Sequence, residues 1–179
     1  GLRTFELNPT MNHRVFWDLA DAAHASLGGL LGAPGEDLAF TSNVTASMNM
    51  AILGLDWQPG DEIVASDHEY GAIDYCMHHA EQRCGIAVKR ALIPRPPAGP
   101  QDIVDAFAAA ITDRTRLLVC SHIFSRTGCI APLRKLAELA HAHGALLASD
   151  GAHAPGMIPL DLAASGCDLY GGNCHKWLC

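Results

Sequence analysis

The chain has 179 residues, of which 49% are apolar and 17% are charged, and its formal net charge is −7. This composition is typical of a globular domain with a hydrophobic core and excludes a disordered chain. The negative charge, without any basic run, disfavours nucleic acid as a partner, and no apolar stretch is long enough to cross a membrane.

The first residues do not show a basic region followed by an apolar one, so we expect no signal peptide and a cytoplasmic protein. Seven cysteines occur without any CxxC pair, and we interpret them as reduced thiols. Ten histidines occur, but the neighbouring ones, His78–His79 and His141/His143, lack a carboxylate or thiolate at ligand spacing. We therefore expect no metal site.

Helices and short apolar strands alternate along the chain. Gly32 to Gly35 close the first helix, Ser42 or Asn43 is placed to cap the second, and residues 94–100 form a proline-rich loop. In chain order we expect helix 12–31, strand 38–41, helix 45–53, strand 62–65, helix 70–83, strand 86–92, helix 101–111, strand 116–120, helix 131–142, strand 145–148, a short helix from 160 and strand 167–170. The pattern predicts an α/β fold with helices on both faces of a mainly parallel sheet.

In such sheets ligands bind outside the carboxyl ends of the strands. Polar residues follow most of the predicted strands, and their side chains are chemically more varied than plain connecting turns require. They are Ser42–Thr45, Ser66–Tyr70, Ser121–His122, Ser125, Asp150–His153 and Asn173–Lys176. We expect the functional site among them.

Lys176 differs from the only other lysines, Lys89 and Lys135, because it follows a strand, two glycines and a histidine. A lysine that forms an imine needs a neutral amine, which desolvation or nearby positive charge provides. A solvated loop lysine is the alternative interpretation.

Asp150 comes directly after an apolar strand, where a carboxylate is costly to bury without a cationic partner. The protonated pyridine nitrogen of pyridoxal phosphate (PLP) is such a partner. The alternative is that Asp150 caps a helix beginning at Gly151. Asp150 and Lys176 follow adjacent predicted strands, so a ring-sized gap between them is expected.

The segment Ser42–Thr45 opens a helix, whose free N–H groups and dipole suit a phosphate. Capping of that helix explains the segment equally well. Tyr70 follows the next strand, where it either stacks on a ring or is an ordinary half-buried tyrosine.

Five segments, in family order and at plausible spacing, resemble the class V aminotransferase family of fold-type I PLP enzymes. That family includes cysteine desulfurases and isopenicillin N epimerase-like proteins. The segments are TSNVTASMN (41–49), DHEYGA (67–72), SHIFSRTG (121–128), SDGAHAPG (149–156) and GGNCHKWL (171–178).

The resemblance implies PLP as the cofactor and gives roles to matched residues. Lys176 would form the internal aldimine, Asp150 would pair with the pyridinium nitrogen, and His153 would lie near the phenolic oxygen. Tyr70 would stack on the ring, and Ser125 would lie near it. The phosphate would be bound by Val44, Thr45, Asn173 and His175. Histidine at 153 and tyrosine at 70 are closer to isopenicillin N epimerase-like proteins than to desulfurases.

The resemblance thus implies a PLP-dependent enzyme acting on an amino acid, by epimerisation, transamination or C–S lysis. The alternatives are a desulfurase-like lyase and a non-catalytic fragment. A desulfurase would need a mobile cysteine beyond Lys176, and Cys179 is too close to Lys176 for that role. We expect residues 1–179 to be an incomplete PLP-binding large domain that lacks an N-terminal segment and a C-terminal small domain. The full-length protein would be a homodimer, and the fragment alone inactive.

Overall fold

The computed structural model describes residues 12–178. The chain forms two compact units, residues 1–40 and 41–179. In the first unit, α2 (Asn12–Leu31) matches the predicted helix and is followed by the short 3-10 helix η1 (Gly35–Asp37). No helix of the described residues is both long and apolar enough to span a membrane.

The predicted strand 38–41 is wrong. Leu38 has extended dihedral angles, but none of these residues pairs with a strand. The ring of Phe40 stacks on that of His24, with 4.4 Å between the ring centroids, and its side chain stays 55% exposed. The apolar residues of this segment therefore do not join the sheet, which begins only with the second unit.

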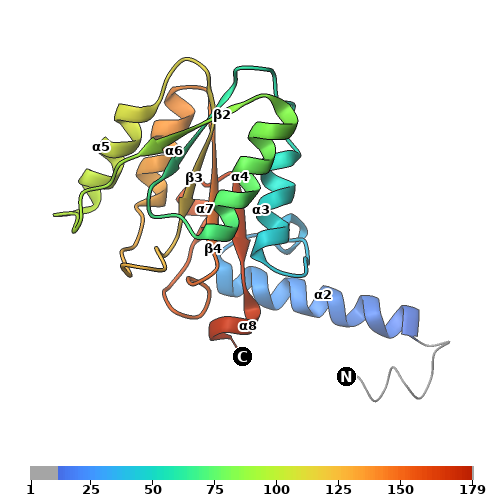
Figure 1. Ribbon diagram of the computed structural model, residues 1–179. Helices are drawn as coiled ribbons and strands as arrows, with labels where there is room; N and C mark the ends of the chain where they lie inside the picture. Colours follow the sequence, from blue (N-terminus) through green and yellow to red (C-terminus); the bar gives the residue numbers. More distant parts are fainter. Residues whose placement is uncertain (1–11, 179) are drawn as a thin grey trace. The chain divides into compact units, whose positions relative to one another are not determined.

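The second unit contains the five-stranded parallel sheet that the sequence predicts (Figure 1). The strand order is β2-β1-β3-β4-β5, and every neighbouring pair runs parallel. The strands are β1 (Glu62–Ser66), β2 (Ala87–Ala91), β3 (Thr115–Ser121), β4 (Leu146–Gly151) and β5 (Leu169–Gly172).

Helices cover both faces of this sheet, as expected for parallel strands whose apolar residues point alternately to either side (Figure 1). Ile63 and Ala65 of β1 pack with α3 (Val44–Leu53) and α4 (Gly71–Cys84). Val64, between them, packs in the opposite core with α5 (Pro100–Ala110) and α6 (Leu133–Ala142). Two cores thus hold the sheet rigid from both sides.

Two short helices complete the second unit. The helix α7 (Leu162–Ser165) is capped by the Asp161 carboxylate, which accepts a hydrogen bond from Ala164 N–H. The helix α8 (Cys174–Trp177) follows β5 directly. The sequence predicts no helix for residues 173–176, so the single turn of α8 is a finding of the structure.

The register of the last strands places the functional candidates at one edge. Ser121 pairs with Asp150 across β3 and β4, and Asp150 pairs with Gly171 across β4 and β5. The segment that carries Lys176 therefore leaves the sheet one strand away from Asp150.

Candidate active site

A cavity of about 200 Å³ lies at the carboxyl ends of the strands. All nine residues that the sequence predicts as cofactor-binding line it: Val44, Thr45, Tyr70, Ser125, Asp150, His153, Asn173, His175 and Lys176. Asn43, Ser121, Ile123 and Ala152 complete the lining. Ser121 was recognised as a polar residue after a strand but was given no role, and the apolar residues carry no signal in the sequence.

Asp150 is the buried acid of this cavity. It belongs to the end of β4, is only 4% exposed, and accepts a hydrogen bond from Ala152 N–H at 2.9 Å. Burial raises its pKa, while that hydrogen bond and the nearby Lys176 and His153 act in the opposite direction. The helix-cap interpretation is wrong, because Gly151 still belongs to β4 and residues 152–153 form a turn.

Lys176 lies on α8 with its Nζ 3.1 Å from Nε2 of His153. Burial and the positive charge of Lys176 lower the pKa of His153, although Asp150 opposes the shift. A neutral imidazole ring is thus favoured beside the lysine. The ring nitrogen can then accept a hydrogen bond from Nζ.

The turn after β4 fixes the position of α8. Gly156 has a φ of +82°, and a Cβ placed there would lie 2.7 Å from Cδ2 of Leu178 and 3.1 Å from the Trp177 carbonyl oxygen. Only glycine accepts both this backbone conformation and this contact at no cost. The turn therefore rests directly against the backbone of the helix that carries Lys176.

The other two lysines lie away from the cavity. Nζ of Lys89 on β2 lies 3.8 Å from the Glu62 carboxylate, and Nζ of Lys135 on α6 donates to Oε1 of Gln101. This agrees with their interpretation as surface residues and leaves Lys176 as the lysine of the cavity.

The N-terminus of α3 forms another wall. Asn43 is its cap and accepts from Ala46 N–H at 3.0 Å, so the predicted cap is Asn43 and not Ser42. Val44 N–H donates to Oδ1 of Asn173, 3.3 Å away, which ties α3 to the end of β5. Val44 N–H and Ala46 N–H already have these acceptors, so the donors that suit an anion at this wall are Thr45, with its N–H and hydroxyl, and the Asn173 amide N–H groups.

Tyr70 is the residue before α4 and is 57% exposed, although it lines the cavity. Its side chain is therefore no part of the hydrophobic core. Ser125 reaches the same cavity from the loop after β3.

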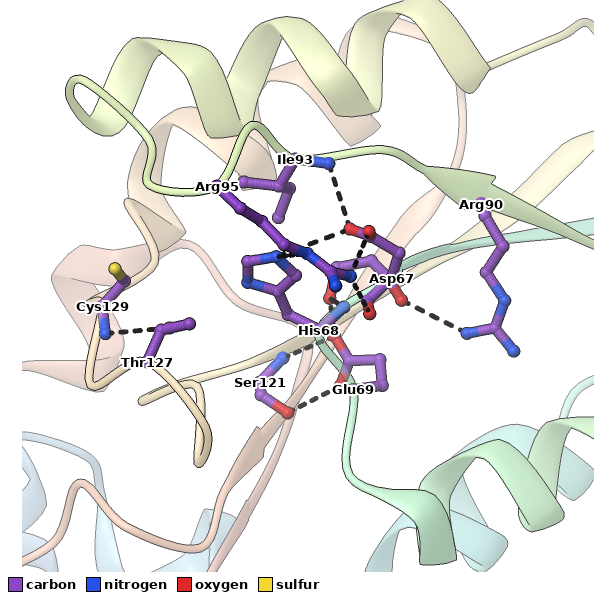
Figure 2. A network of polar contacts seen from close by, with 10 residues as sticks. Asp67, His68, Glu69, Arg90, Ile93, Arg95, Ser121, Thr127 and Cys129 are labelled. Carbon is purple, nitrogen blue, oxygen red and sulfur yellow. Dashed lines mark hydrogen bonds and ion pairs between the residues drawn. The ribbon is translucent and has the colours of Figure 1, made fainter.

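Behind Tyr70, the segment Asp67–Glu69 is held by a polar network (Figure 2). Arg95 donates to Oδ2 of Asp67 at 2.6 Å and to Nε2 of His68 at 3.0 Å. Burial acts to raise the pKa of Asp67, but hydrogen bonds from Ile93 N–H and Arg95 outweigh it, so the pKa is lowered. Glu69 turns inward and is hydrogen-bonded to Ser121. Within residues 12–178, no group of three His, Cys, Asp or Glu side chains is placed to hold a metal ion.

Known proteins that are similar to this chain come from one family of enzymes. The family model described as aminotransferase class-V matches residues 10–179. The isopenicillin N epimerase of Amycolatopsis lactamdurans is 43% identical over 161 residues, which cover 87% of this chain and 40% of that protein. The isopenicillin N epimerase of Streptomyces clavuligerus is 40% identical over 156 residues, covering 87% of this chain and 39% of that protein. A probable cysteine desulfurase of Halobacterium salinarum is 34% identical over 160 residues, which cover 87% of this chain and 38% of that protein.

Solved structures share the fold. A mutant of C-DES with glycine covalently linked to its PLP cofactor has a TM-score of 0.91 at 24% identity, and the match covers 98% of this chain and 47% of C-DES. The cysteine desulfurase CsdA of Escherichia coli has a TM-score of 0.81 at 26% identity, covering 94% of this chain and 43% of CsdA. The chain thus spans about 40% of the length of the curated relatives it matches.

Proposed function

The chain belongs to the class V aminotransferase family, as its motifs predict, and on that premise we propose that it forms the cofactor-binding part of a PLP-dependent enzyme acting on an amino acid. One observation carries the proposal: a buried carboxylate, a lysine and a helix N-terminus from separate parts of the chain line one cavity. These are the groups that a pyridine ring nitrogen, an aldehyde and a phosphate require.

The residues present fit PLP. Asp150 is a buried carboxylate, and such a group is stable when a cation faces it, as a protonated ring nitrogen does. Lys176 supplies the amine for covalent attachment, and His153 would lie near the phenolic oxygen. Tyr70 offers an aromatic face, Ser125 a hydroxyl near the ring, and the phosphate would be held by Val44, Thr45, Asn173 and His175.

When bound, PLP supplies an electron sink for the bonds at the α-carbon of an amino acid. The protein residues would hold and move protons around it. Asp150 would keep the ring nitrogen protonated, and Nζ of Lys176 would carry the α-proton. His153, 3.1 Å from that Nζ, would orient it by accepting a hydrogen bond at Nε2.

Among the reactions of the family, we propose one of the isopenicillin N epimerase type. The support is the identity of 43% and 40% to two such epimerases, against 34% to the desulfurase of Halobacterium salinarum. C–S lysis is the second candidate, because desulfurases match over the same share of the chain. The full-length protein should be incubated with isopenicillin N and, separately, with cysteine. Epimerisation alone would support the first candidate, and release of sulfur from cysteine the second.

We also propose that the chain is part of the PLP-binding large domain and that the full-length protein is a cytoplasmic homodimer. Its match to about 40% of each curated epimerase supports a partial domain. A reducing compartment is supported by the free thiols in the described part of the chain, which are Cys76, Cys84, Cys120, Cys129, Cys167 and Cys174.

Covalent trapping tests the cofactor proposal directly. Borohydride reduction of the full-length protein with PLP, followed by peptide mapping, should place the pyridoxyl mass on Lys176. Lys176→Ala should abolish the label, whereas Lys135→Ala, as a control at a lysine outside the cavity, should keep it. A label on Lys89 or Lys135 would contradict the proposal.

A further inference from the structure

Glu69 is a carboxylate buried directly behind the cavity. It is 4% exposed and lies just before Tyr70, in the segment between β1 and α4. Its Oε1 accepts from the Ser66 hydroxyl at 2.5 Å and from Ser121 N–H at 3.0 Å. Its Oε2 accepts from the Ser121 hydroxyl at 2.6 Å (Figure 2). One side chain therefore joins the carboxyl ends of β1 and β3 to the segment that carries Tyr70.

All the groups that hydrogen-bond to Glu69 are neutral donors. This distinguishes it from Glu62, which is equally buried at the opposite end of β1 but is bonded by Arg114. A buried carboxylate without a cation is harder to ionise, and burial raises the pKa of Glu69 to about 7 although the serine donors oppose the shift. Once Glu69 is ionised, its field reaches far in the low-dielectric interior. The titratable groups coupled to it electrostatically are Asp150 on β4 and the Cys120 thiol on β3.

The network also fixes the orientation of the Ser121 hydroxyl. Ser121 lines the cavity and pairs in register with Asp150. Because its only hydroxyl hydrogen is donated to Glu69, its oxygen can only accept hydrogen bonds from a ligand. Ser121 thus presents a hydrogen-bond acceptor beside Asp150.

We propose that Glu69 is a positioning residue of the cofactor site, which turns the Ser121 hydroxyl into a fixed acceptor and, once ionised, adds a second negative charge behind Asp150. This inference rests on the proposed function. Two carboxylates behind the ring would hold a cationic ring nitrogen more firmly than Asp150 alone, because coupling between charges is reciprocal.

The test uses Glu69→Gln in the full-length protein. The amide has the same shape, but its N–H2 group must donate to the Ser121 oxygen and so turns that hydroxyl hydrogen away from residue 69. We expect PLP affinity to fall roughly 10- to 100-fold, the usual effect of losing one hydrogen bond to a charged group. The pH at which the visible band of bound PLP changes should fall by roughly half to one unit, because protons on the cofactor lose a negative neighbour.

Glu62→Gln is the matched control. It removes an equally buried carboxylate and should lower stability without moving affinity or spectrum, since Glu62 lies at the amino end of β1. Ser121→Ala is the second variant and keeps the charge. Ser121→Ala should weaken PLP binding without changing the pH at which the visible band of bound PLP changes. This variant tests the inference even if Glu69→Gln does not fold.

The outcomes separate cleanly. A normal affinity and spectrum in both Glu69→Gln and Ser121→Ala, or effects of Glu69→Gln no different from those of Glu62→Gln, would overturn the inference while the proposed function stands. Wild-type protein that binds no PLP at all would overturn the proposed function and the inference together.

Discussion

Asp150 illustrates how one residue acquires a role through its place in the fold. In sequence it is an acid after an apolar run, which suits both a cap and a cofactor contact. In the structure it is 4% exposed, is the penultimate residue of β4 and shares a cavity with Lys176. Burial raises its pKa, so its charge depends on the cations that face it.

We predict that Asp150→Asn in the full-length protein lowers turnover at least about 100-fold while PLP still binds. The amide keeps the shape and can hydrogen-bond, but it does not hold the ring nitrogen protonated, and lost electrostatic stabilisation of this kind costs several kcal/mol in the transition state. Turnover measured beside spectral titration with PLP checks this. Near-normal turnover would reduce Asp150 to a residue that closes the turn at Ala152.

Glu69 gives a prediction about stability and pH. Burial raises its pKa from 4.5 to about 7, although the hydrogen bonds from Ser121 and Ser66 oppose the shift. Between these two pH values the folded state holds a proton that the unfolded chain has lost. The free energy of unfolding should therefore fall as the pH rises from about 4.5 to about 7, and level off above.

Glu69→Gln should remove this slope, because the amide does not titrate. Asp150 contributes in the same direction and is present in both proteins, so the difference between their slopes reports Glu69 together with its electrostatic effect on Asp150. Urea unfolding of both apo-proteins at several pH values measures this difference in the free energy of unfolding. Parallel curves for variant and wild type would show that Glu69 titrates normally.

At the level of secondary structure, the sequence predicts those elements that periodicity and caps define. The helix 12–31 agrees to the residue, and the predicted strands of the sheet agree within two or three residues at their ends. The strand 38–41 fails because an apolar run does not reveal whether a partner strand exists. The helix α8 was missed because a single turn has no periodicity.

In the candidate site, too, the sequence predicts some residues and not others. Its residues follow strand ends, and the rule for parallel sheets brings them together without any knowledge of distances. Glu69 escaped attention because its neighbours in sequence are equally polar. Only the pairing of β1 with β3 reveals that it turns inward to Ser121 rather than toward solvent.

The turn that supports α8 provides a prediction at this level. Gly156→Ala should destabilise the protein by roughly 2–3 kcal/mol and weaken PLP attachment, because it adds strain at positive φ and pushes against Trp177 and Leu178. Gly144→Ala is the control, since Gly144 has a φ of +69° and open space around its Cβ position. It should cost only about 1 kcal/mol and leave PLP attachment unchanged. Equal effects of both variants on PLP would contradict the support role of the turn.

At the level of the whole molecule, the site lies at one edge of the described sheet. The strand β5 pairs only with β4, and α8 follows it directly. Lys176 is exposed, whereas Asp150 across the cavity is buried. Large apolar side chains are also exposed on the helices of one face, among them Met50 of α3 (65%) and Tyr75 of α4 (78%). Such surfaces are usually covered by further chain or by a partner subunit.

The exposure of Lys176 and of these apolar side chains predicts how the 179-residue chain behaves by itself. Lys176 and Tyr70 line the cavity but are exposed, so water competes there for the groups that would hold the cofactor. The chain alone should therefore bind PLP at least about tenfold more weakly than the full-length isopenicillin N epimerase of Amycolatopsis lactamdurans, and it should turn over no amino acid. Spectral titration with PLP and an epimerisation assay on both proteins, with sedimentation to compare their oligomeric states, provide the test. If the 179-residue chain is soluble, binds PLP as tightly as the epimerase and is active, then the cavity needs no further enclosure and the proposal of a partial domain is wrong.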